Sequence, residues 1–156
     1  MGLQIFFKIN KISVSVFKPL TIILGFGGDI VLAYYTYNRL VNFDTILDLS
    51  FKLNGLSRGD LNPEAMAMMK QVYLSSLNIM IYAFLAIHAL IYLFFFTKRK
   101  FAWNYLKFYF ICAIFGVFYF VATESFAGNF TTLLFSPMIV AYIFMAVGID
   151  QFFPKE

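Results

Sequence analysis

Charged side chains are scarce in this sequence. They make up 13% of its 156 residues, whereas about a quarter of the residues of a soluble domain carry charge. Hydrophobic residues make up 62% of the chain, and a soluble fold of this length has no interior large enough to cover them. The composition therefore excludes an ordinary soluble domain and predicts one polytopic membrane domain over residues 1–156.

Cysteine and histidine are scarcer still, with one residue of each, Cys112 and His88. A lone cysteine excludes a disulfide within the chain, and a lone histidine excludes a haem held by two histidines of one chain. The motifs H-E-x-x-H and G-x-S-x-G and a glycine-rich phosphate loop are also absent from the sequence. We therefore expect no cofactor and favour a non-enzymatic role, while an enzyme acting on a lipid or quinone with His88 as general base stays open.

A stripe of basic residues, which would indicate nucleic-acid binding, is missing despite the formal charge of +4. The basic residues flank apolar segments instead, so anionic lipid is the better partner for them. We expect the chain to contact the lipid bilayer and either further copies of itself or a larger membrane complex, and not nucleic acid.

Long apolar runs are what the sequence does have, and four of them can cross a bilayer as α-helices. Pro19 falls in the first turn of the first run, where proline is tolerated. Pro137 falls inside the fourth run and is expected to kink it. The sequence thus predicts an all-α membrane protein, a bundle of four transmembrane helices at about residues 18–40, 72–96, 101–123 and 131–149.

Two further segments are expected outside the hydrocarbon core. Residues 3–16 alternate apolar side chains with Lys8, Asn10 and Lys11, which is typical of an amphipathic segment lying in the interface. Residues 42–70 form an outer helical loop, with a short surface helix at about 44–53 and a break at Gly55.

The end of the outer loop carries a helix-start pattern. Asn62, Pro63 and Glu64 are typical of an N-cap, a first-turn proline and an acid that complements the helix dipole. We predict that a helix begins here and continues into the second span.

Lysine and arginine are distributed unequally between the two sides of the membrane that these spans define. Eight lie on the side of the termini: Lys8, Lys11, Lys18, Lys98, Arg99, Lys100, Lys107 and Lys155. Four lie on the other side: Arg39, Lys52, Arg58 and Lys70. Positive residues concentrate on the cytoplasmic side, so we predict a multi-pass protein of the bacterial inner membrane with both termini in the cytoplasm.

Asp29 and His88 are the ionisable residues that fall well inside predicted spans. Each lies about ten residues from the basic end of its span, so at about 1.5 Å per residue both lie roughly 15 Å from the same membrane face. Burial disfavours the charged form of each side chain, and we predict that the two lie within direct or one-water reach and share a proton. Such a pair could carry protons, bind a cation or ligand, or only hold two helices together.

Small residues lie beside Asp29 on one face of the first span. Gly25 and Ala33 lie four residues before and after it, with Gly28 alongside, which is typical of close helix packing. This face could contact another helix of the chain or the same face of a second copy.

A few other polar residues in the spans are candidates for a polar lining: Ser75, Asn78, Tyr82 and Cys112. A soft metal could be held by residues from four different spans, Asp29, His88, Cys112 and Met138. Nothing in their spacing requires such a site, so we expect no metal.

The function that these features favour is that of an oligomeric channel or transport-type unit with Asp29 and His88 as its polar centre. The alternative of another class is an accessory or assembly subunit that docks on a larger membrane complex.

Overall fold

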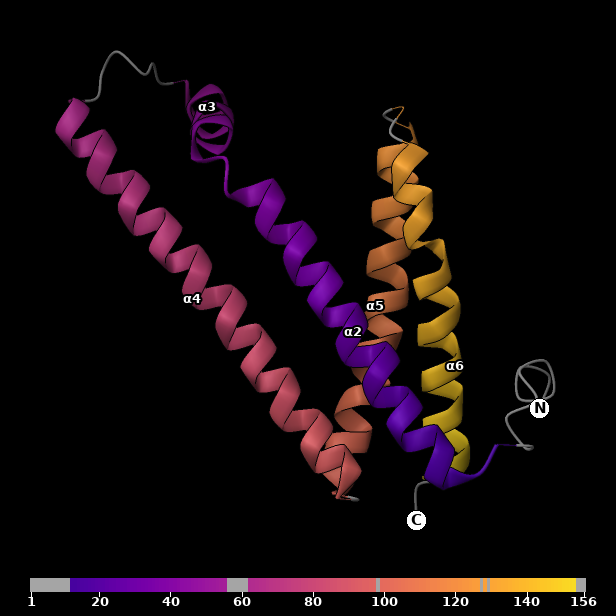
Figure 1. Cartoon of the computed structure of the whole chain (residues 1–156). Helices are drawn as coiled ribbons and strands as arrows, with labels where there is room; N and C mark the ends of the chain where they lie inside the picture. Colours follow the sequence, from indigo (N-terminus) through magenta and orange to yellow (C-terminus); the bar gives the residue numbers. More distant parts are fainter. Residues whose placement is uncertain (1–11, 56–61, 98, 127, 129, 154–156) are drawn as a thin grey trace. The chain divides into compact units, whose positions relative to one another are not determined.

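The computed structural model describes residues 12–55, 62–97, 99–126, 128 and 130–153, and the regular structure in these ranges is entirely helical. Within these described ranges, three helices are long and apolar enough to cross a membrane. They are α2 (Val14–Leu40), α4 (Pro63–Phe96) and α5 (Lys100–Phe126), labelled in Figure 1. The chain is therefore a helical, membrane-embedded protein, as its composition predicted. The predicted interfacial segment lies, over residues 3–11, outside the described residues.

The fourth predicted span differs from the structure. Residues 131–149 do not form one α-helix, because a 3-10 helix, η3 (Phe130–Phe135), precedes the shorter apolar helix α6 (Ser136–Phe152). Pro137 does not kink a helix interior but lies in the first turn of α6, where its missing N–H breaks no helical hydrogen bond. With 17 residues α6 is about 26 Å long, less than the ~30 Å of a bilayer core. The structure therefore does not confirm a bundle of four full-length transmembrane helices, which stays a prediction.

Pro19 also lies in a different place from the one predicted. The helix α2 begins at Val14, with the Phe17 N–H donating to the Ser13 carbonyl, so Pro19 lies inside the helix rather than in its first turn. Proline cannot donate to the carbonyl four residues earlier, which leaves that of Ser15 without its helical donor.

The outer segment follows the local sequence pattern. The short helix α3 (Phe43–Asn54) ends at Gly55, whose φ of 67° is in the left-handed region that favours glycine. The predicted start of α4 is confirmed, because the Asn62 side chain accepts from the Glu64 N–H at 3.0 Å and Pro63 is the first helical residue. α4 then runs without interruption to Phe96.

The chain divides into two compact units. Unit 1 comprises Met1–Gly28 and His88–Glu156, and unit 2 comprises Asp29–Ile87. Helices α2 and α4 each contribute one part to each unit, whereas α5 and α6 belong to unit 1 and α3 to unit 2.

Unit 1 has a densely packed aromatic interior. In it α5 and α6 lie side by side (Figure 1), and α5 buries a row of residues at near-helical spacing, Ala102, Leu106, Phe110 and Val117. Phe17 of α2 is fully buried, with its ring centroid 4.9 Å from that of Phe152. Its ring occupies the space that a Cβ on Gly148 of α6 would need, so the glycine is required for this approach.

Unit 2 is fastened at one end by α3. Phe43 and Leu47 of α3 are buried, and the Phe43 ring packs on Tyr73 of α4 with centroids 5.4 Å apart. The Tyr73 hydroxyl donates to the Leu40 carbonyl at 2.8 Å, which ties the end of α2 to α4. An exposed ion pair, Lys70 with Asp44 at 3.7 Å, adds to this contact.

Candidate functional site

His88 is buried in unit 1, with 3% of its surface exposed. Its Nε2 lies 3.0 Å from the Tyr105 hydroxyl of α5, and the tautomer of the ring decides which of the two donates. The Tyr109 ring meets the imidazole edge-on at 4.5 Å between centroids. Tyr105 itself is 38% exposed, so the hydrogen bond joins the buried imidazole to a partly exposed side chain.

Asp29 of α2 is fully buried, at 0% exposure. It is the first residue of unit 2, whereas His88 begins the second segment of unit 1. The expected burial of both side chains is found, and the contact expected between them stays a prediction.

The glycines next to Asp29 face tyrosines of their own chain. In unit 1 the Tyr92 hydroxyl of α4 fills the space where a Cβ on Gly25 would lie. The Tyr142 hydroxyl of α6 lies 2.7 Å from the corresponding position on Gly28. Gly27 meets nothing within 4 Å, so it is not part of this contact. Small residues therefore admit aromatic side chains here rather than another helix backbone, and farther along α2 the predicted packing residue Ala33 is 5% exposed.

Two buried polar residues near the start of α2 were not predicted as site residues. Lys18 is 7% exposed and donates to the Phe96 carbonyl at 3.1 Å, with its Nζ 5.8 Å from the Phe96 ring centre. It thus caps the C-terminal end of α4, where a cation is favourable. Thr21, one turn farther, is fully buried, and its Oγ1 has no hydrogen-bond partner within the described part of the chain.

Sequence reasoning also missed Tyr105 and Tyr109, the neighbours of His88. Their spacing of four on α5 places them on one helix face, and their rings lie parallel within 8° at 6.3 Å between centroids. That spacing was visible in the sequence, whereas their placement against α4 was not.

The candidates for a polar lining do not gather in one place. Cys112 of α5 is exposed, and Ser75 of α4 is exposed without facing any described cavity. Asn78 and Tyr82, in contrast, both line one groove in unit 2. Within the described ranges, no three His, Cys, Asp or Glu residues cluster as ligands for a metal ion.

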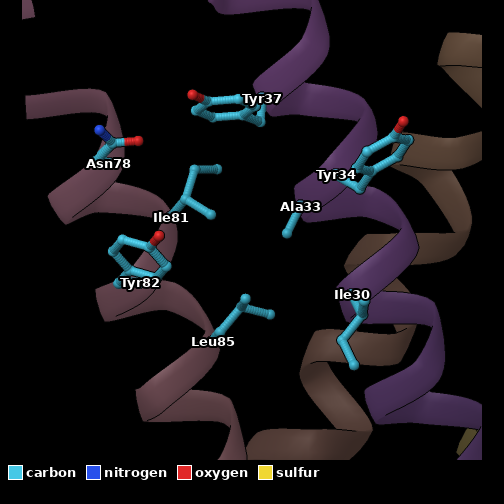
Figure 2. Close-up of a pocket in the computed structure, with 8 residues that line it drawn as sticks. All are labelled: Ile30, Ala33, Tyr34, Tyr37, Asn78, Ile81, Tyr82 and Leu85. Carbon is cyan, nitrogen blue, oxygen red and sulfur yellow. The ribbon is translucent and has the colours of Figure 1, made fainter. Parts of the chain in front are cut away.

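The groove has a volume of about 350 Å³ and lies between α2 and α4. Figure 2 shows its lining, four residues from each helix: Ile30, Ala33, Tyr34, Tyr37, Asn78, Ile81, Tyr82 and Leu85. Tyr37 and Asn78 lie at one end and Ile30 and Leu85 at the other, so the groove is polar at one end and aliphatic at the other.

Comparison with protein-family models, with curated proteins and with solved structures finds no match to this chain.

Proposed function

We propose that this chain is a transport-type membrane unit in which Asp29 and His88 bind and release protons inside the membrane. The observation that carries the proposal is the burial of both groups, at 0% and 3% exposure. Ionisable side chains within the lipid core cost several kcal/mol unless they are paired, hydrated or neutralised, and they mark ion pathways more often than other positions do.

The hydrogen bond between His88 and Tyr105 supports a proton role in particular. Imidazole and phenol both accept and donate, so a proton can pass between them without movement of the helices. Tyr105 is 38% exposed, so it is the group through which a proton would reach or leave the buried imidazole in this proposal.

The unit is proposed to act as an oligomer with cytoplasmic termini. Few helices leave little interior for an aqueous path, so several copies would supply the missing walls. Since Gly25 and Gly28 contact tyrosines of their own chain, a second copy would use another helix face. The excess of Lys and Arg beside the termini favours the cytoplasmic placement, and the bacterial inner membrane is the proposed location.

Proton flux into liposomes tests the proposal. The purified protein is reconstituted into vesicles that contain a pH-sensitive dye, and a potassium diffusion potential drives proton entry. We expect flux above that of protein-free vesicles, and a loss of about tenfold or more in Asp29→Asn and in His88→Gln, because each replaces an ionisable side chain with an amide. Asp48→Asn, on the exposed face of α3, is the matched control and should retain the flux.

Flux equal to that of empty vesicles, or wild-type flux in both Asp29→Asn and His88→Gln, would refute the proton role. Tyr105→Phe gives a finer test, because it keeps the ring and removes the hydroxyl that bonds His88. Slower flux with unchanged folding supports the route through Tyr105.

A second candidate, the accessory subunit, is favoured by apolar side chains exposed on the outer segment. Leu53 of α3 is 78% exposed and Met68 of α4 66% exposed. Such side chains can seat a partner protein. Under this function Asp29→Asn would alter complex assembly, measured by co-purification, whereas under the first it changes flux with assembly intact.

A further inference from the structure

The groove in unit 2 has the chemistry of a bilayer lipid along its length. Tyr37 and Asn78, at one end, offer an O–H and an N–H₂ donor. Ile30 and Leu85, at the other end, are purely aliphatic. A ligand that fits this order has hydrogen-bond acceptors at one end and a hydrocarbon chain at the other.

The groove also fits within the depth of one lipid leaflet, because its lining spans seven residue steps on each helix, about 10.5 Å at 1.5 Å per residue. The bond between the Tyr73 hydroxyl and the Leu40 carbonyl marks the end of the span, next to the aromatic and polar residues with which α2 ends. From Leu40, Tyr37 lies about 4.5 Å inward and Ile30 about 15 Å inward at 1.5 Å per residue. Half of a ~30 Å hydrocarbon core is about 15 Å, so with Leu40 at the edge of the core the polar end would lie within one helical turn of the ester level and the aliphatic end near the midplane.

The size of the groove favours a single hydrocarbon chain as occupant over a helix. A volume of about 350 Å³ falls in the range of small-ligand sites, roughly 300–1,000 Å³. A helix is about 10–12 Å across with its side chains, so it could insert only a few side chains into the groove, whereas one hydrocarbon chain could lie along its length. From this size, depth and polarity we infer that the groove is a binding site for one phospholipid acyl chain, with Tyr37 and Asn78 donating to the ester carbonyls. Ile30, at the aliphatic end of the groove, directly follows Asp29 in the chain, but lipid binding in the groove does not require the proposed proton function.

Photo-crosslinking in vesicles tests this site. The protein is reconstituted with a phosphatidylcholine that carries a diazirine in one acyl chain, and the adducts are mapped by peptide mass spectrometry. We expect adducts concentrated on residues 30–37 and 78–85 and, in native mass spectrometry after detergent extraction, one lipid retained per chain.

Two groove variants with matched controls make the test specific. Ala33→Phe fills the groove and should abolish both the concentrated adducts and the retained lipid, whereas Ala83→Phe, on an exposed face of α4, should change neither. Asn78→Leu should weaken lipid retention by about threefold to tenfold, the range that one lost hydrogen bond gives. Ser75→Leu makes the same kind of change about one turn farther out and should retain the lipid.

Three results would overturn the inference. The first is an even spread of adducts over all exposed apolar residues, which indicates only bulk lipid around the protein. The second is unchanged retention in Asn78→Leu and Ala33→Phe. The third is a disulfide between copies that both carry Tyr82→Cys, formed efficiently in vesicles, which would place a second chain in the groove.

Discussion

Units 1 and 2 share helices α2 and α4 but pack them differently. In unit 1 the part of α2 up to Gly28 contains three glycines. Tyrosine hydroxyls occupy the space that a Cβ on Gly25 or Gly28 would need. In unit 2 the remainder of α2, from Asp29 to Leu40, contains no glycine, and a groove lies between it and α4. A glycine lets an aromatic ring come close, whereas larger side chains hold the helices apart.

The two units should therefore differ in what they contribute, unit 1 mainly stability and unit 2 mainly room for a ligand. The filled interior of unit 1 should contribute more to the folding free energy than unit 2, because it packs several buried aromatic rings against one another. Unit 2, with its groove and its exposed residues, should tolerate substitution better and keep room for a ligand.

Loss of the Phe17 ring is the substitution expected to cost most. Phe17→Ala removes a fully buried ring that contacts Gly148 and Phe152 and should destabilise the protein by about 3–5 kcal/mol. Thermal unfolding in detergent measures the effect, with Phe118→Ala, 64% exposed on α5, as control. Equal shifts for the two variants would show that unit 1 has no dominant core.

Substitution of Gly28 should give the next largest loss of stability. Gly28→Ala places a methyl group 2.7 Å from the Tyr142 hydroxyl and should cost about 1–3 kcal/mol. Gly27→Ala, in open space, should be neutral or stabilising by about 0.5–1 kcal/mol. Adding Tyr142→Phe to Gly28→Ala should restore part of the loss, and a failure to do so would contradict the proposed fit.

In unit 2 the N-cap of α4 should matter less than the core of unit 1. Asn62→Ala removes the acceptor for the Glu64 N–H and should destabilise α4 by about 1 kcal/mol. Asn62→Asp keeps the acceptor and serves as control. Hydrogen exchange of residues 63–70 measures the fraying, and unchanged protection in Asn62→Ala would show that packing alone fixes this helix start.

The exposed ion pair of unit 2 should contribute least. Lys70→Met removes the ion pair with Asp44 and should cost no more than about 1 kcal/mol, less at high salt. Lys52→Met, an exposed lysine elsewhere in unit 2, is the control. A loss comparable with that of Phe17→Ala would reverse the order of the two units.

The sequence predicted the features that depend on near neighbours along the chain. The start of α4 at Asn62 and Pro63 and the end of α3 at Gly55 follow from capping and backbone preferences, which act within a few residues. The burial of Asp29 and His88 followed from the apolar runs around them.

The side-chain pairs that the sequence did not predict depend on which helices contact each other. Two hydrogen bonds show this, one between His88 and Tyr105 and one from Lys18 to the Phe96 carbonyl. Each joins residues far apart in sequence, and no local pattern fixes such pairs.

The predicted position of Pro137 was wrong for a local reason. The apolar run continues on both sides of this residue, which predicts a span interior, although proline also favours the first turn of a new helix.

The fit of the Tyr142 hydroxyl against Gly28 has a consequence for how sequences of this kind can diverge. Any side chain at position 28 needs the space that this hydroxyl fills, so the two positions are not free to drift independently. In descendants of this chain, alanine or serine at position 28 should arise together with phenylalanine or a smaller residue at position 142, whereas position 27 should vary without regard to either.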